Sequence, residues 1–366
     1  MRAYTAQRSI RRPLLDVLVI GAGQAGLAMG RELERAGYDH LIIDAARTIG
    51  SAWQNRWDSL RLFTPAAYSS LPGIPFPAAP HHLPKRLEVV DYLANYARAF
   101  NMPIALDEPV RALRLKGGNT FHAHTDYACY RAQHVVVATG GYQAPKIPAF
   151  AAMLPSTVAQ LHSSAYRNPS QLSNGPVIVV GAGNSGVQIA AELSSSHHVT
   201  LATGAPLIRL PEHLMGRSIF SWLDATGAMD VTVNSRIGRR ISRREMLIGE
   251  SAARIAKSHG IRVVPRIVRA EGRALRAADD TLVQASTVIW ATGFKPSYSW
   301  LQVPVFGGDG HPVHTRGVTS VPGLYFLGLP WQHTRGSSLL GWVARDAEYI
   351  SGHISRSLSQ YDDRAA

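Results

Sequence analysis

Two glycine-rich segments of the same form stand 160 residues apart in this chain of 366 residues. The first reads Gly21-Ala22-Gly23-Gln24-Ala25-Gly26 and the second reads Gly181-Ala182-Gly183-Asn184-Ser185-Gly186. Each follows an apolar run and precedes a segment of helical character, the context in which G-x-G-x-x-G cradles the pyrophosphate of a dinucleotide. The phosphates then lie on free N–H groups at the positive end of a helix. Two such fingerprints predict two dinucleotides, with electrons passing between them.

A carboxylate follows the next apolar run after the first fingerprint. Asp44 lies 18 residues after Gly26, close to the spacing of about 20 at which an acid accepts the ribose hydroxyls of a dinucleotide. We therefore assign Asp44 to the ribose of the first dinucleotide. The alternative is a solvent-exposed aspartate at the end of a strand.

The second fingerprint has no such acid. The position equivalent to Asp44 falls on Ala202, Thr203 or Gly204, and Arg209 follows a few residues later. An arginine there could pair with a 2′-phosphate, which favours NADPH over NADH, although Arg209 also fits a plain surface arginine. The first site is expected to hold FAD, because hydride transfer from a nicotinamide to a flavin is direct. The cofactors then carry the reaction, and no catalytic side chain is predicted.

Two apolar strands that end in the same tripeptide indicate how the two nucleotide sites are arranged. One ends at Ala138-Thr139-Gly140, before the second fingerprint, and the other ends at Ala291-Thr292-Gly293, after it. The simplest organisation inserts the second domain into the first, with these strands near the crossings. We predict an α/β fold of two Rossmann-like dinucleotide-binding domains. The FAD-binding domain comprises residues 1–159 and 286–366, and the inserted NADPH-binding domain comprises residues 160–285.

Two loops are expected to surround the flavin. Residues 50–84 are rich in proline, glycine and aromatic residues, and a loop of this length is usually functional. Its aromatic residues either anchor the loop on the core or line the flavin ring. The last predicted strand, residues 323–328, leads into a second loop and a helix at about 339–355, and this loop should touch the first nucleotide.

Composition limits the class of protein. The chain is 46% apolar and 17% charged, and its basic N-terminus runs into the first strand, so we expect a cytoplasmic globular protein. Cys129 is the only cysteine, which excludes electron relay through a dithiol. The net charge of +13 suits two polyanionic cofactors. The arginines of residues 236–276 are interpreted as a solvated or phosphate-facing surface and not as a nucleic-acid site.

Several segments together resemble the class B flavoprotein monooxygenases, specifically the flavin-containing monooxygenases and their smaller bacterial and YUCCA-type plant relatives. The resemblance covers nearly the whole chain. It is carried by the two fingerprints with Asp44 and by further segments: Gly50-Ser51-Ala52-Trp53, Ser59-Leu60-Arg61-Leu62, Leu71-Pro72-Gly73, Pro75-Phe76-Pro77, Tyr92-Leu93, Tyr96-Ala97 and Ala291-Thr292-Gly293-Phe294.

The resemblance implies that NADPH reduces FAD, that oxygen adds at flavin C4a as a (hydro)peroxide, and that a small nucleophilic sulfur, nitrogen or carbonyl compound is then oxygenated. A homo-oligomer is left open. With the fingerprints, Asp44 and Arg209, the expected cofactor-binding residues are Trp53, Arg61, Thr64, Val110, Thr139, Gly140, Thr292, Gly293 and Gln332.

Three departures from the family pattern stand out. Ser156 and Val158 replace the Phe and Gly of the motif that continues to His162 and Tyr166, and we interpret His162 as structural. Phe63 aligns with an asparagine found near the flavin in the flavin-containing monooxygenases. Loss of this asparagine would let hydrogen peroxide escape. The chain also has Gly328-Leu329-Pro330 in place of the Gly-Asp common at the end of FAD folds.

Other functions are weighed against this one. The nearest alternative is an NADPH-dependent flavin reductase or oxidase, which shares every nucleotide motif, and a nucleotide sensor without turnover is less favoured. No metal site is predicted, because His81-His82, His197-His198 and His311 with His314 lack ligand spacing. A serine hydrolase is excluded because no Gly-x-Ser-x-Gly elbow follows a strand.

Overall fold

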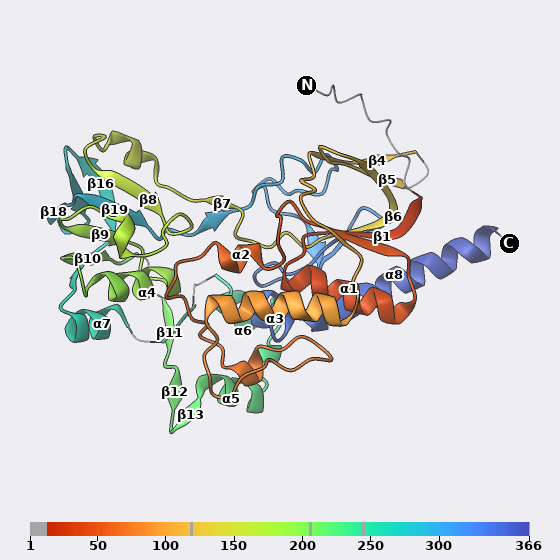
Figure 1. The fold of residues 1–366 in the computed structure, drawn as a ribbon, viewed down its shortest axis with the longest axis horizontal. Helices are drawn as coiled ribbons and strands as arrows, with labels where there is room; N and C mark the ends of the chain where they lie inside the picture. The colour runs from red at the N-terminus through yellow and green to blue at the C-terminus, as the bar shows by residue number, and fades with distance from the viewer. Residues whose placement is uncertain (1–12, 118–119, 205–206, 244–245, 250, 366) are drawn as a thin grey trace, which may run out of the picture.

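The computed structural model describes residues 13–117, 120–204, 207–243, 246–249 and 251–365. The basic N-terminal residues Arg2, Arg8, Arg11 and Arg12 lie outside these ranges. No helix among the described residues is long and apolar enough to cross a membrane. Two sheets with flanking helices occupy opposite ends of the molecule (Figure 1).

The larger sheet holds the first fingerprint. Its strand order is β21-β22-β23-β6-β1-β2-β3, and the β4–β5 hairpin is attached to β6. The strands β2, β1, β6 and β23 run parallel. Their bounds are β1 (Leu14–Ile20), β2 (His40–Ile43), β3 (Ile104–Ala105), β4 (Ala112–Lys116), β5 (Thr120–His124), β6 (Cys129–Val137), β21 (His314–Thr315), β22 (Val318–Thr319) and β23 (Leu324–Phe326).

Strand β1 shows why this sheet is buried on both faces. Val17 and Val19 pack into one core cluster together with Leu27 of helix α1 (Gln24–Ala36), whereas Leu18 and Ile20 pack into a second cluster on the other face. A central parallel strand covered on both sides is expected to be apolar at every position. Helix α1 contacts α3 (Arg86–Ala99) and α8 (Val343–Ala365), and these three helices lie together in Figure 1.

The smaller sheet holds the second fingerprint. Its order is β15-β10-β9-β19-β8, and all of its pairings are parallel. The strands are β8 (Ala159–His162), β9 (Val177–Val180), β10 (Val199–Ala202), β15 (Arg262–Val264) and β19 (Thr287–Trp290), with helices α4 (Asn184–Leu193) and α7 (Ala252–His259). A separate three-stranded sheet of β16 (Ile267–Glu271), β17 (Ala274–Ala277) and β18 (Leu282–Gln284) completes this domain.

A short antiparallel pair lies where the chain passes between the two domains. Strand β7 (Ala144–Pro145) pairs with β20 (Phe294–Lys295), and Figure 1 shows β7 between the two halves. Strand β19 belongs to the smaller sheet although it follows the predicted domain end at residue 285. We therefore propose that the two crossings lie at the β7–β20 pair and not at residues 160 and 285.

The remaining elements lie between β10 and β15 in the sequence. They are β11 (Ile208–Leu210) paired with β14 (Met246–Ile248), β12 (His213–Leu214) paired with β13 (Arg217–Ser218), and helices α5 (Ile219–Ala225) and α6 (Arg236–Ile241). In the larger domain the loop after β2 contains only the short helix α2 (Ser51–Gln54) and a 3₁₀ turn.

Candidate functional site

The first fingerprint forms the turn between β1 and α1. Gly21 has a φ of +114°, and a Cβ there would come within 2.5 Å of the Ala138 carbonyl oxygen. A Cβ on Gly26 would come within 1.8 Å of the Gly21 carbonyl oxygen, whereas one on Gly23 would meet nothing within 4 Å. No side chain caps α1, so the N–H groups of Gln24 and Ala25 point out of its first turn. This glycine cradle with uncapped N–H groups fits a pyrophosphate.

Asp44 stands directly beside this turn. One carboxylate oxygen accepts the N–H of Ala22 at 2.6 Å, and the other accepts the N–H of Ala46 at 2.8 Å. Two backbone donors fix the carboxylate in one orientation, and each oxygen keeps a lone pair for a further donor. The half-buried Asp44 therefore fits the predicted ribose contact.

The second fingerprint repeats the same backbone contacts. Gly181 has a φ of +110°, and a Cβ there would lie 2.3 Å from the Ala291 carbonyl oxygen. A Cβ on Gly186 would lie 1.8 Å from the carbonyl oxygen of Gly181, and no side chain caps α4. Each Ala-Thr-Gly tripeptide thus lies against the first glycine of one fingerprint. The duplication seen in the sequence extends to the contacts of individual atoms.

Hydrogen bonds identify the counterpart of Asp44 as Thr203. The Asp44 N–H donates to Ala105 at 3.0 Å, and the Thr203 N–H donates in the same way to Val264 at 2.9 Å. The second site thus has a hydroxyl where the first has a carboxylate. Arg209 is exposed on β11, and its side chain makes no hydrogen bond or ion pair with the described residues. These features fit the predicted contact with a 2′-phosphate.

Asn184 differs from the prediction in how its side chain is used. Its amide nitrogen donates to the carbonyl of Met246 at 3.3 Å, and its amide oxygen accepts the N–H of Ile248 at 3.2 Å. Both groups therefore hold β14 against the start of α4. The backbone N–H groups of Asn184 and Ser185, in the uncapped first turn, are what this position offers a phosphate.

Three distant segments meet at the first turn of α1. Trp53 donates its indole N–H to the side-chain oxygen of Gln24 at 3.2 Å, and the Gln24 amide donates to the carbonyl of Ser338 at 3.4 Å. The two loops predicted to surround the flavin are thereby joined to the first fingerprint. The loop that contains Ser338 was predicted to touch the first nucleotide, but the Ser338 carbonyl itself could not be identified, because a backbone group has no sequence signature.

The other predicted residues of the first site have varied surroundings. Thr64 is buried and accepts a hydrogen bond from Ser69, and Thr139 accepts one from Gln143 at 2.8 Å. Gly140 has a φ of +70°, and the half-buried Val110 packs beside the second core cluster. Thr139 adjoins the first fingerprint, since a Cβ on Gly21 would lie 3.2 Å from its backbone nitrogen. The contacts of all four residues with FAD remain predictions.

Gln332 points into the protein. It is buried, its side-chain oxygen accepts the N–H of Leu329 at 3.3 Å, and a Cβ on Gly317 would lie 2.5 Å from its amide nitrogen. That nitrogen is buried without a hydrogen-bond partner among the described residues. The orientation leaves the backbone of this loop, and not the amide, as the group that faces the first site.

Arg61 and Thr292 lie where the two domains meet. The exposed guanidinium of Arg61 is 3.9 Å from Glu212, and its carbonyl accepts from Gln188 of α4 at 3.2 Å. Thr292 donates its hydroxyl to the Lys146 carbonyl. Arg61 thus connects segments of different domains, and Thr292 joins the two connections next to the β7–β20 pair.

His162 has the contacts of a structural residue. Its Nε2 lies 2.9 Å from the carbonyl oxygen of Gly293, its Nδ1 lies 2.9 Å from the Ser164 hydroxyl, and its ring meets Phe294 edge-on at 4.9 Å. Burial and the nearby Arg56 guanidinium lower the pKa of His162, so the ring is neutral and donates to Gly293. This arrangement holds β8 to the crossing strand β20.

An aromatic cluster of Phe63, Tyr68, Phe220 and Trp342 joins both loops to α5. Phe63 stacks on Phe220 at 6.2 Å between ring centroids, and Tyr68 stacks on Trp342 at 5.9 Å. Phe220 also contacts Tyr68 at 6.0 Å and Trp342 at 5.7 Å. Phe63 and Tyr68 are only half-buried. Some aromatic residues of the 50–84 loop thus make contacts with the inserted domain and do not only anchor the loop on its own core.

Comparison with known proteins identifies the family to which this chain belongs. The family model described as pyridine nucleotide-disulphide oxidoreductase matches residues 18–328. A CzcO-like oxidoreductase from Geobacillus kaustophilus is 46% identical over 93% of this chain and 98% of its own. A probable indole-3-pyruvate monooxygenase of Arabidopsis thaliana, YUCCA3, is 26% identical over 88% of this chain and 84% of its own.

A solved structure agrees with the family model and with these relatives. The flavin-containing monooxygenase from Stenotrophomonas maltophilia superposes with a TM-score of 0.78 at 30% identity, covering 94% of this chain and 99% of that one. The two-domain fold predicted from the fingerprints and the predicted family are thereby confirmed. The chain belongs to the pyridine nucleotide-disulphide oxidoreductase family and, within it, to the class B flavin monooxygenases, so it is a flavin-dependent oxidoreductase.

Proposed function

We propose that this protein is an FAD-dependent, NADPH-consuming monooxygenase that oxygenates a small molecule at a nucleophilic sulfur or nitrogen, or at a carbonyl group. FAD occupies the turn between β1 and α1, and NADPH occupies the turn between β9 and α4. The bound cofactors supply the electrons and activate the oxygen. The observation that carries the proposal is the repeated glycine cradle, in which Gly26 and Gly186 each lie against the carbonyl of their own first glycine.

The residues of the chain bind and orient the two dinucleotides. The uncapped first turns of α1 and α4 receive the pyrophosphates. Asp44, held by the N–H groups of Ala22 and Ala46, accepts the ribose hydroxyls at the first site. At the second site Thr203 presents no negative charge, and the exposed Arg209 pairs with the 2′-phosphate of NADPH.

The aromatic cluster supports an apolar substrate. Phe63 and Tyr68 come from the loop that follows the Trp53 contact with Gln24, and Trp342 lies four residues after Ser338. The cluster therefore lies beside the segments that meet at the first fingerprint. Its rings exclude water from that neighbourhood, which protects a reactive site. We infer that the substrate packs an aromatic or aliphatic part against these rings.

One observation favours a second function, that of an NADPH oxidase or reductase. Phe63 stands at the position that the sequence aligns with an asparagine of the flavin-containing monooxygenases, and its ring is stacked on Phe220. A hydrocarbon ring donates no hydrogen bond, so any stabilisation that an amide supplies there is absent. In this case the electrons of NADPH leave as hydrogen peroxide or pass to another acceptor.

One experiment separates these functions. The purified protein is reduced with NADPH without oxygen, and the flavin absorbance is followed before and after air is admitted. Hydrogen peroxide released is then compared with NADPH consumed in the presence of amines, thioethers and ketones. A monooxygenase releases less peroxide than NADPH consumed when its substrate is present, with oxygenated product making up the difference. Equal amounts of peroxide released and NADPH consumed with every compound would favour the oxidase. Protein that binds no flavin would refute both functions.

A further inference from the structure

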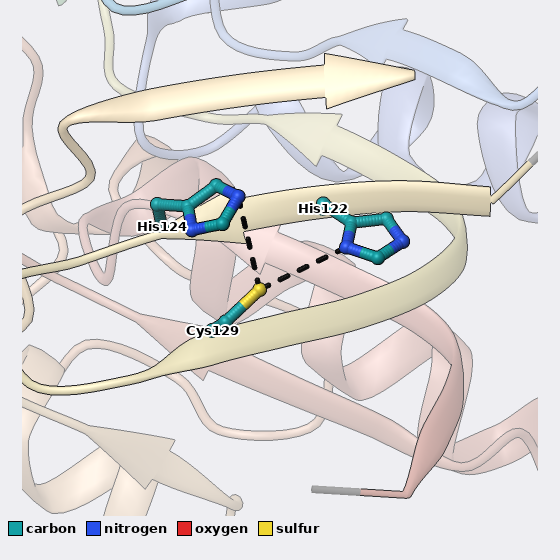
Figure 2. Close-up of side chains that lie close together, drawn as sticks. All are labelled: His122, His124 and Cys129. Atoms are coloured by element: carbon teal, nitrogen blue, oxygen red, sulfur yellow. Dashed lines mark hydrogen bonds between the residues drawn. The ribbon is translucent and has the colours of Figure 1, made fainter. Parts of the chain in front are cut away.

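Two histidines and the only cysteine of the chain gather on one face of the β5–β6 hairpin. His122 and His124 are two residues apart on β5, so both point to the same side of the sheet. Cys129, the first residue of β6, is paired directly with His124 across the strands. Phe121 and Ala123 alternate with the histidines and are buried on the other side. Figure 2 shows the three polar side chains turned toward one another.

The distances from the sulfur to the two imidazole nitrogens are slightly longer than those in a metal-loaded site. The Cys129 Sγ lies 3.9 Å from His122 Nδ1 and 3.9 Å from His124 Nε2. All three atoms lie within 4.8 Å of one another. Ordinary zinc–sulfur and zinc–nitrogen bonds place sulfur and nitrogen about 3.6 Å apart in tetrahedral geometry and about 3.8 Å apart in trigonal geometry. Contractions of a few tenths of an ångström would bring the sulfur to these distances from both nitrogens.

We propose that His122, His124 and Cys129 bind a transition-metal ion, Zn²⁺, through one thiolate and two imidazoles. Sulfur and nitrogen donors select zinc or monovalent copper over magnesium and calcium, which prefer oxygen. Three protein ligands leave a fourth position for water. All three side chains are half-buried, so the ion can enter from solvent.

The surroundings of the site make the thiolate its most important ligand. Lys116 and Arg131 act electrostatically on His122, and Arg131 faces it across the strand pair. Arg114, on the opposite neighbouring strand, donates to Gln302 at 2.6 Å. These positive charges oppose a cation, and the negative charge of ionised Cys129 offsets part of that repulsion. Loss of the sulfur should therefore weaken binding more than loss of either imidazole.

The site is separate from the proposed dinucleotide sites. Cys129 begins strand β6, and Val137, which precedes the Ala138-Thr139-Gly140 segment, ends it. The eight residue steps between them span about 26 Å at about 3.3 Å per step. The bound ion therefore takes no part in electron transfer to the flavin and instead ties β5 to β6. An ion that binds only the folded protein raises its stability, and the proposed monooxygenase reaction should not change.

The sequence predicted no metal site, because the histidine groups in it lack helical spacing with a carboxylate or cysteine ligand. The spacing of His122 and His124 is informative only once both are known to lie on a strand. Cys129 joins them only through the antiparallel register of β5 and β6. The pairing of strands, and not a local motif, creates this group.

Zinc competition measures the site in the flavin-loaded protein. Chelator-treated protein is titrated with Zn²⁺ in the presence of a chromophoric chelator, and the bound metal is counted after gel filtration. We expect one Zn²⁺ per chain, bound at least about tenfold more weakly in His122→Ala and weaker still in Cys129→Ser. His259→Ala, which changes an exposed histidine at the end of α7, is the matched control and should bind as the wild type does. Unchanged binding in Cys129→Ser, or no binding by the wild type, would overturn the proposal.

A second measurement needs no variant. Because Cys129 is the only cysteine, iodoacetamide adds one mass increment to the intact protein, and its rate reports on this thiol alone. Zn²⁺ should slow the alkylation at least about tenfold, as coordination occupies the sulfur. An alkylation rate that does not change with saturating Zn²⁺ would show that the thiol is not a ligand. Flavin absorbance recorded on the same samples confirms that the fold and the dinucleotide site are intact.

Discussion

Asp44 and Thr203 occupy the same position in the two halves of the protein. Each follows the strand that comes after the fingerprint helix of its domain, and each donates its N–H to the neighbouring parallel strand, at 3.0 Å for Asp44 and 2.9 Å for Thr203. The two sites differ most where this residue meets the ribose. A carboxylate accepts ribose hydroxyls and repels a 2′-phosphate, whereas the hydroxyl of a threonine carries no charge that would repel one. This difference underlies the assignment of FAD to one site and NADPH to the other.

Coenzyme preference should respond to this position and to Arg209. Arg209→Ala is expected to lower kcat/KM for NADPH at least about tenfold, because a charge-assisted pair with the 2′-phosphate is lost. The value for NADH should change little, and Thr203→Asp should shift the preference further toward NADH. Steady-state flavin reduction with both coenzymes measures the ratio. Arg217→Ala, which removes an exposed arginine on β13, serves as the control. A parallel loss with both coenzymes would contradict the assigned role.

FAD binding should depend on the charge of Asp44. In Asp44→Asn one of the two backbone N–H groups from Ala22 and Ala46 faces an amide nitrogen and loses its acceptor. An unpaired donor of this kind costs about 1–3 kcal/mol, so we expect FAD to bind about tenfold more weakly or worse. Flavin retained after gel filtration measures the loss. Asp91→Asn, at an exposed position of α3, should retain flavin as the wild type does.

The glycines of the two fingerprints should separate folding from binding. A Cβ on Gly26 clashes with a carbonyl oxygen at 1.8 Å, whereas a Cβ on Gly23 meets no protein atom within 4 Å. Gly26→Ala is therefore expected to lower the melting temperature, and Gly23→Ala is expected to fold normally but to bind FAD poorly. Gly186→Ala makes the same 1.8 Å clash in the smaller domain, so it is also expected to lower the melting temperature. A Gly23→Ala protein that keeps its full FAD affinity would argue against the proposed cradle.

Phe63 should control how much oxygen is lost as peroxide. Phe63→Asn restores a hydrogen-bond donor, worth about 1 kcal/mol, which corresponds to about fivefold in the partition between product and peroxide. We expect less peroxide per NADPH in Phe63→Asn than in the wild type. Phe63→Leu, which also breaks the stack on Phe220 but supplies no donor, is the matched control. Equal peroxide yields in the two variants would show that an amide at this position does not control peroxide release.

Stability should fall on mild acidification because of His134. Burial lowers the pKa of His134 from its ordinary value of 6.5 to about 4, and both ring nitrogens are buried without a hydrogen-bond partner among the described residues. Above pH 6.5 the ring is neutral in both states and has no effect on the pH dependence. As the pH falls from 6.5 toward 4, the unfolded chain takes up a proton that the folded protein excludes. This costs the folded state about 2 kcal/mol between pH 7 and pH 5.

Urea unfolding at the two pH values tests this effect. The variant His134→Leu should show a smaller loss of stability on acidification than the wild type does. His311→Leu, which removes an exposed histidine, should show the wild-type loss. If both variants respond alike, His134 is not the titrating group.

The sequence determined most of the fold, for a physical reason. A fingerprint between an apolar strand and a helix admits few structures, so both turns, the strand before each and Asp44 were predictable. The membership of β19 in the smaller sheet was not predictable, because an apolar strand that ends in Ala-Thr-Gly fits either domain equally well. The contact between Phe63 and Phe220 was also not predictable, because the distance between these residues depends on how the two domains are arranged. The use of the Asn184 side chain by β14 was also not predictable, because residues 62 positions apart come together only through the tertiary fold of the inserted domain.

The paired crossing strands β7 and β20 have a mechanical consequence. Because the two connections are hydrogen-bonded to each other, the coenzyme-binding half can tilt about one common hinge, while independent twisting of either connection is resisted. Away from this hinge, the halves are also joined by the aromatic cluster, in which Phe63 stacks on Phe220, and by exposed contacts such as that of Asn168 with Asp58 at 2.7 Å. Opening on that side would expose the spent coenzyme to solvent, so its exchange requires no separation of the hinge strands.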